Sequence, residues 1–155
     1  MSTNPDGLAG LSNMLRSAIG DLLDPKADTF LDMFADDGVM EFPFAPPGGI
    51  SRLDGRTALA AYFPEITKMI QFDRFTTPTV YRTTDPGVVV LDFEGFGHGV
   101  ATGLPYEQRY LSVITVDRGR IVRYLDFWNP IVVLRTVGDE EAMKAALGGG
   151  HGNSE

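Results

Sequence analysis

An aspartate interrupts one of the most apolar stretches of this chain. In RGRIVRYLDFWNP, positions 118–130, Asp126 stands between Tyr124 and Trp128 in a run rich in β-branched and aromatic residues, which predicts a strand. If the carboxyl group is buried there, desolvation raises its pKa towards neutrality and makes it a usable general acid or base. The alternative is a structural carboxylate bonded to Arg109, Tyr124 or backbone amides.

The alternation of a strand sorts the neighbours of Asp126 onto two faces. The face of Asp126 is expected to carry Val122, Tyr124 and Trp128, and the opposite face Ile121, Arg123, Leu125 and Phe127. Both faces are partly apolar, so the second face also needs a cover. We therefore expect a homodimer that packs through the outer face of the sheet.

His98 is the second candidate catalytic residue. It lies in GFGHG, where Gly95, Gly97 and Gly99 leave one side of a strand without side chains, which either makes room for a ligand or marks bulges that bend the sheet. A bulge could turn His98 into a cavity. The alternative is an ordinary surface or core histidine.

Charged residues on the neighbouring strands offer further possibilities. Arg109 would be a natural partner for a substrate carboxylate or for Asp126 itself. Asp92 and Glu94 share one face of their strand, and we interpret them as solvated or interface charges, or as ion-pair partners of Arg123, rather than as an acid-base pair.

Composition removes several classes of function. The chain has no cysteine and only two histidines, so no metal site is expected, and it contains neither the GxxxxGK phosphate loop nor a GxSxG motif. No cofactor is needed. The net charge of -8 makes nucleic acid and anionic membranes poor partners. Without a signal-like or membrane-spanning stretch, a cytoplasmic location is the default expectation.

Hydrophobic periodicity indicates which elements position these residues. Helices are predicted over 8–23, from Pro25 to about Phe34, and over about 54–70, with a short strand 39–44 between the second and third. Strands follow at 75–83, 88–99, 106–116 and 121–128, the last two joined by a tight hairpin at Arg118-Gly119, before a helical tail.

This order predicts one α+β domain over residues 1–147, followed by a flexible tail, 148–155. We expect a cone: a strongly curved antiparallel sheet wrapped around three N-terminal helices, with an interior pocket lined by alternate strand residues. The apolar residues expected to shape the pocket and bind the substrate are Met40, Phe42, Tyr62, Phe63, Phe93, Tyr124 and Trp128, together with Arg109.

Three segments carry a family resemblance. LDMFADDGVMEF, DGRTALAAYF and PYEQRYLSVITVDRGRIVRYLDFWNP resemble the nuclear transport factor 2-like superfamily, in particular its polyketide-cyclase-like (SnoaL-like) and ketosteroid isomerase-like branch. LDFEGFGHG and FWNPIVVLRTVG are similar to the phenazine-biosynthesis small proteins. In those proteins the acid of the final strand is implicated in acid-base work, and Asp126 matches it. In polyketide-cyclase relatives a histidine lies near the position of His98.

At several positions the sequence differs from two other members of the superfamily, and these differences argue against their reactions. Limonene epoxide hydrolase holds water and relays protons with polar residues, whereas the matching positions here appear as Met40, Phe42, Phe93 and Gly95. The oxyanion-hole tyrosine that steroid isomerase carries on its first helix has no counterpart in residues 8–23. Epoxide hydrolysis and the steroid isomerase arrangement are therefore not expected.

The sequence thus predicts a small cofactor-free enzyme that acts on a hydrophobic cyclic or polyketide-like molecule by general acid-base proton transfer, as an isomerase, cyclase or dehydratase. Asp126 would be the acid-base residue, and His98 or Arg109 would stabilise developing negative charge. The alternative is a non-catalytic module on the same fold that binds an apolar ligand or a protein partner.

Overall fold

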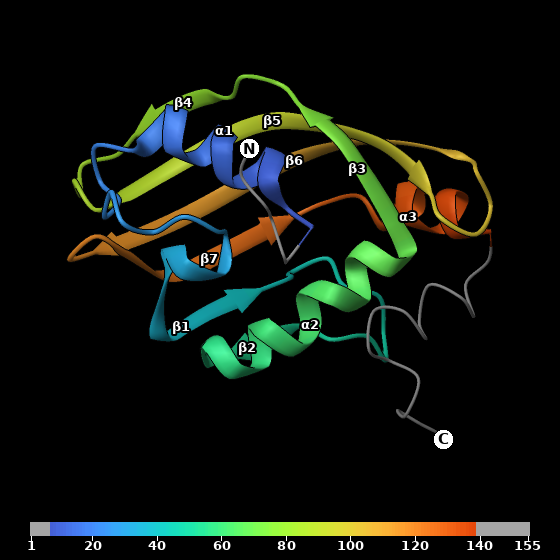
Figure 1. Ribbon diagram of the computed structural model, residues 1–155, viewed down its shortest axis with the longest axis horizontal. Helices are drawn as coiled ribbons and strands as arrows, with labels where there is room; N and C mark the ends of the chain where they lie inside the picture. The colour runs from blue at the N-terminus through green and yellow to red at the C-terminus, as the bar shows by residue number, and fades with distance from the viewer. Residues whose placement is uncertain (1–6, 139–155) are drawn as a thin grey trace.

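A curved sheet of seven strands forms the body of the protein, and helices cover its concave face and one end (Figure 1). The computed structural model describes residues 7–138. The helical elements are α1 (Ala9–Ile19), the 3-10 turn η1 (Leu31–Met33), α2 (Gly55–Met69) and α3 (Pro130–Val137). The strands are β1 (Phe34–Glu41), β2 (Arg52–Asp54), β3 (Ile70–Phe75), β4 (Thr79–Arg82), β5 (Val88–Gly99), β6 (Pro105–Asp117) and β7 (Arg120–Phe127). The α+β class is confirmed.

The sheet is mixed rather than wholly antiparallel. Its strands are hydrogen-bonded in the order β2-β1-β7-β6-β5-β3, with β4 also paired to β5, and β1 runs parallel to β7. About eighty residues separate Glu41 from Arg123, which are joined by an ion pair at 2.8 Å across this parallel pair. No hairpin links the two strands, so nothing local forces them to be antiparallel. The prediction of an antiparallel sheet was wrong at this position.

The predicted second helix is absent, and with it the arrangement of three N-terminal helices. Residues 24–33 form turns that end in η1, and β1 begins at Phe34. The side chains of Thr29 and Asp32 each accept a hydrogen bond from the other residue's backbone N–H, at 3.1 and 3.4 Å; this capping box starts the short η1 turn after Thr29, so the helical segment does not begin at Pro25. The third helix of the fold, α3, instead follows the sheet.

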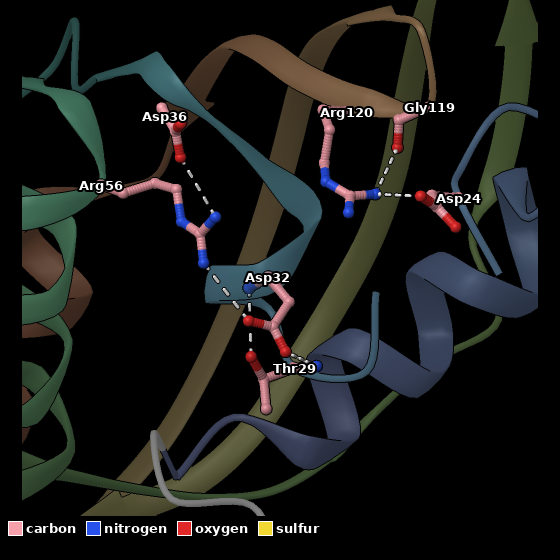
Figure 2. A network of polar contacts seen from close by, with 7 residues as sticks. All are labelled: Asp24, Thr29, Asp32, Asp36, Arg56, Gly119 and Arg120. Carbon is pink, nitrogen blue, oxygen red and sulfur yellow. Dashed lines mark hydrogen bonds and ion pairs between the residues drawn. The ribbon is translucent and has the colours of Figure 1, made fainter. Parts of the chain in front are cut away.

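Long-range ion pairs hold this turn segment against the sheet (Figure 2). Arg120, at the start of β7, lies 2.9 Å from the Asp24 carboxylate, and Arg56 on α2 contacts the carboxylates of Asp32 and Asp36 at 3.4 Å each. Phe30 is consequently directed into the core, where its ring packs against Phe34, Phe63 and Tyr124.

A two-residue turn sets the register of β6 and β7. Arg118 and Gly119 both have positive φ, 54° and 81°, as the predicted tight hairpin requires. A bulge then shifts the register between Thr115 and Val116. As a result Ile121 is fully buried and Val122 only half-buried, the reverse of the faces predicted for this end of the strand. Beyond the bulge the predicted alternation holds.

No helix within residues 7–138 is long and apolar enough to cross a membrane. The core lies between the concave face of the sheet and the elements α1, η1 and α2, and it is rich in aromatic side chains. This core is not filled completely.

Candidate active site

A cavity of about 80 Å3 lies between the sheet and the helices. Side chains from α1, α2, α3, β1, β3, β5, β6 and β7, together with Phe30 of the turn before η1, form its wall, which is predominantly aromatic and aliphatic. The polar groups that border it are the carboxyl of Asp126, the indole N–H of Trp128 and the hydroxyls of four tyrosines: Tyr62, Tyr106, Tyr110 and Tyr124.

Asp126 borders this cavity from β7, opposite Ser112 of β6. Among the residues that the structure describes, none forms a hydrogen bond or ion pair with its carboxyl group. Burial without a compensating partner disfavours the charged form and raises the pKa of Asp126 to about 7. The group therefore titrates in the range where a general acid or base is most effective.

The four tyrosines remain protonated around this carboxyl group. Burial raises the pKa of each phenol well above its ordinary value, and the negative charge of Asp126 contributes to the shift in all four. A protonated phenol can donate a hydrogen bond to an oxygen on which negative charge develops. The cavity thus combines one titratable acid with several neutral donors.

Two of these phenols are hydrogen-bonded to each other. The hydroxyl oxygens of Tyr106 and Tyr110, on the inner face of β6, are 2.6 Å apart. One hydroxyl proton lies between the two oxygens, so the second proton is left for a third oxygen atom. Tyr124 is hydrogen-bonded to Ser112 at 2.9 Å, whereas Tyr62 makes no side-chain hydrogen bond within residues 7–138.

A buried amide fixes the end of β7 that carries Asp126 and Trp128. The Gln108 side chain donates to the carbonyl of Asn129 at 3.0 Å and accepts from its N–H at 2.9 Å. The Asn129 side chain in turn accepts from the N–H of Ile131 and caps α3. Gln108 therefore continues the β6-β7 pairing where the backbone ladder has ended at Phe127.

The structure brings most of the predicted site residues together. Besides Asp126, the cavity wall contains all seven apolar residues proposed for substrate binding. Tyr124 of β7 and Trp128, directly after this strand, flank Asp126; Met40 lies near the end of β1, and Phe42 directly follows that strand. Tyr62 and Phe63 belong to α2, and Phe93 belongs to β5.

His98 lies outside the cavity. Its side chain is 46% exposed, and Nδ1 lies 3.5 Å from the carboxylate of Asp73. The glycines around it do not open space for a ligand. A Cβ at Gly97 would lie 1.8 Å from the Gln71 carbonyl oxygen, and one at Gly95 2.8 Å from the Phe75 ring. The glycines instead allow β3 and aromatic rings to pack closely against β5.

Arg109 also lies away from Asp126. It alternates with Gln108 and Tyr110 on β6 and so points to the outer face, where its guanidinium binds both carboxylate oxygens of Asp92 at 2.7 and 3.0 Å. The hydrogen bond from Arg109 lowers the pKa of the Asp92 carboxyl. Arg109 is therefore the partner of an outer-face acid and does not reach Asp126.

The tyrosine pair and Gln108 were missed as functional residues. The signal was present in PYEQRYLS, where every second residue from Tyr106 to Ser112 carries a hydroxyl or an amide. All four of these side chains are buried. A polar residue at each inward position of a strand indicates a polar network or a site rather than an ordinary core.

Several known proteins resemble this chain in sequence and in fold. The family model described as the SnoaL-like domain matches residues 19–124. "Uncharacterized protein YesE" of Bacillus subtilis is 41% identical over 124 residues, which cover 80% of this chain and 84% of that protein. "Uncharacterized PhzA/B-like protein PA3332" of Pseudomonas aeruginosa is 40% identical over 114 residues, covering 72% and 78%. The crystal structure of the "Putative Isomerase from Bacillus subtilis" has a TM-score of 0.72 and 38% identity, covering 87% of this chain and 96% of that one.

Proposed function

The chain belongs to the SnoaL-like domain family, and on that basis we propose that it is a cofactor-free enzyme that transfers a proton on a hydrophobic cyclic or polyketide-like small molecule. The observation that carries the proposal is Asp126, an unpartnered carboxyl within residues 7–138 that borders an apolar cavity and has a pKa raised to about 7. An isomerase, a cyclase or a dehydratase that works by proton transfer can use such a group.

The proposed step starts from a substrate with a carbonyl group. The Asp126 carboxylate removes a proton from the carbon beside the carbonyl; the C–H bonding electrons form the new carbon-carbon double bond, and the carbonyl π electrons move to its oxygen. The Tyr106-Tyr110 pair, whose oxygens are 2.6 Å apart, has a proton to donate to that oxygen. The Asp126 carboxyl then exchanges its proton with solvent and protonates the same carbon, which completes an exchange, or, where a carbon-carbon double bond is conjugated with the enolate, protonates the far end of that double bond, which isomerises the substrate.

Hydrogen-deuterium exchange tests this step without knowledge of the natural substrate. Cyclohexanone in D2O exchanges its α-protons for deuterium whenever a base removes and returns them, and NMR spectroscopy measures the rate. We expect the protein to accelerate the exchange, with a rate that rises as pH passes through about 7, where the carboxylate forms. General base catalysis typically contributes ~10²–10⁴-fold, so Asp126→Asn should cost at least ~10².

Asp92→Asn is the matched control, because Asp92 is an outer-face aspartate paired with Arg109. We expect it to leave the exchange rate within about twofold of the wild type, as for most surface changes. Equal exchange by the wild type and Asp126→Asn would contradict the assignment of Asp126. A His98→Ala variant tests the catalytic role predicted for that residue: a rate loss would support the role, and an unchanged rate would agree with its position outside the cavity.

One observation favours the second candidate function, a non-catalytic binding module. His98 and Arg109, the predicted stabilisers of negative charge, both pair with acids outside the cavity. A binding module would hold an apolar ligand without accelerating exchange at any pH. Saturable ligand binding together with exchange at the rate of the buffer would support this second function against the first.

A further inference from the structure

Resting on the proposed function, we infer that the cavity selects an uncharged, single-ring compound with a carbonyl oxygen, and that it rejects carboxylates and compounds of several fused rings. Three properties of the cavity wall lead to this substrate class: its charge, its hydrogen-bond donors and its size. Each property is independent of whether the bound compound is turned over.

The charge of the wall disfavours anions. None of the described residues that line the cavity is an arginine, lysine or histidine, and Asp126 is the one acidic residue among them. Arg109, the arginine of β6, lies between Tyr106 and Tyr110 in the sequence, but its guanidinium binds Asp92 on the outer face of the sheet. A ligand carboxylate would lose its hydration, find no counterion and lie in the same small space as Asp126.

The donors of the wall require an acceptor. The Tyr106-Tyr110 pair has one proton that is not shared between its two oxygens, and the Tyr62 hydroxyl makes no side-chain hydrogen bond to any residue in 7–138. A carbonyl oxygen accepts two hydrogen bonds and can satisfy these donors.

The size of the cavity limits the ligand to about one ring. A cavity needs ~10–15 Å3 of volume for each water molecule that it holds. The cavity volume of about 80 Å3 therefore corresponds to five to eight water molecules. A six-membered ring with one oxygen has seven heavy atoms and matches this capacity, whereas a four-ring steroid does not. Packed rings resist enlargement of the cavity: Phe93 stacks on Tyr110 with centroids 5.2 Å apart, and Phe42 lies 5.4 Å from Tyr62.

The single tryptophan of the chain provides the probe. Trp128 lines the cavity and is the only source of an indole N–H signal in a 1H-15N NMR spectrum. We would titrate the full-length protein at pH 8 with three compounds: cyclohexanone, cyclohexanecarboxylate and androstenedione. The first two share one ring and differ in charge, and the third adds fused rings. Binding is read as a saturable shift of the Trp128 signal.

We expect cyclohexanone to bind at least ~10-fold more tightly than cyclohexanecarboxylate, a factor equal to about 1.4 kcal/mol. Androstenedione should leave the Trp128 signal unchanged. Carboxylate binding as tight as that of the ketone would overturn the charge selection. Saturable steroid binding would overturn the size limit.

Variants separate charge from size. Asp126→Asn removes the negative charge at pH 8, so it should tighten carboxylate binding; no gain for the carboxylate would contradict the electrostatic argument. Phe93→Ala should admit two-ring 2-decalone, which the wild type excludes. If this variant does not fold, Met69→Ala on the half-buried part of the wall makes the same test. Failure to admit 2-decalone would contradict the size argument.

These binding outcomes are distinguishable from the outcome of the exchange experiment. A protein that prefers the ketone but does not accelerate deuterium exchange would keep the inferred ligand class and lose the proposed catalytic function. A protein that accelerates exchange but binds the carboxylate as tightly as the ketone would keep the proposed catalytic function and lose the inferred ligand class.

Discussion

The ionised carboxylate of Asp126 is expected to lower the stability of the fold, because it is desolvated at the cavity. Its pKa is about 7 in the folded protein against an ordinary 3.8, so the folded state holds the proton more tightly than the unfolded chain. This proton stabilises the fold fully below about pH 4, and the contribution disappears as pH rises to about 7. Asp126→Asn has no proton to lose. We expect its stability advantage over the wild type to grow through this window by up to about 1.4 kcal/mol per pH unit and then to level off.

Urea unfolding at several pH values measures this difference. Asp92→Asn is the control with the opposite sign, because the hydrogen bond from Arg109 lowers the pKa of Asp92 and the paired carboxylate stabilises the fold above its ordinary titration range. That variant should be no more stable than the wild type at pH 8. A pH-independent difference between Asp126→Asn and the wild type would show that Asp126 is not desolvated in solution.

At the scale of the elements, the junction of β7 and α3 depends on Gln108. Its amide forms two hydrogen bonds with the backbone of Asn129, and the side chain is 1% exposed. Gln108→Leu keeps a similar volume but leaves a backbone N–H and a carbonyl without these partners. Asn129 is exposed, so water can replace part of the lost bonding; at about 0.5–1.5 kcal/mol for each of the two hydrogen bonds, we expect a loss of roughly 1–3 kcal/mol in urea unfolding.

Glu107→Leu on the exposed side of the same strand is the control and should change stability by less than about 0.5 kcal/mol. The Trp128 indole signal supplies a second measurement, because Trp128 directly precedes Asn129. It should shift in Gln108→Leu and stay in place in Glu107→Leu. A Gln108→Leu variant as stable as the wild type would show that β7 and α3 are held by other contacts.

At the scale of the whole molecule, we propose a homodimer that packs through the outer face of the sheet. This face carries exposed apolar side chains: Leu111 is 42% exposed, and Phe44, at 57%, packs on Phe127 with ring centroids 5.3 Å apart. Together with the Arg109-Asp92 pair they border a shallow surface groove. Burying such a face against a second copy would remove apolar area from water.

Light scattering at micromolar concentration should give about twice the chain mass of 16.9 kDa. Leu111→Asp places a charge in the proposed interface and should shift the protein to the monomer, whereas Val100→Asp at the exposed end of β5 should not. A monomeric wild type would contradict the proposed dimer.

Local sequence patterns were sufficient to predict the orientation of Asp126 and the hairpin between β6 and β7. The alternation around Asp126 placed it on one face with Tyr124 and Trp128, because side chains of a regular strand change face at every residue. The hairpin at Arg118-Gly119 was likewise readable, since a two-residue turn needs residues that tolerate positive φ.

Tertiary pairing decided the rest. The parallel contact of β1 with β7, the bulge that buries Ile121, the outward position of His98 and the 2.6 Å contact of Tyr106 with Tyr110 all depend on which strands approach each other and in what register. Residues distant in the chain determine these pairings, and no local period encodes them. The sequence by itself therefore determined the fold family and the candidate acid, whereas only the tertiary structure decided which groups surround that acid, because the cavity is assembled from eight helices and strands spread along the chain.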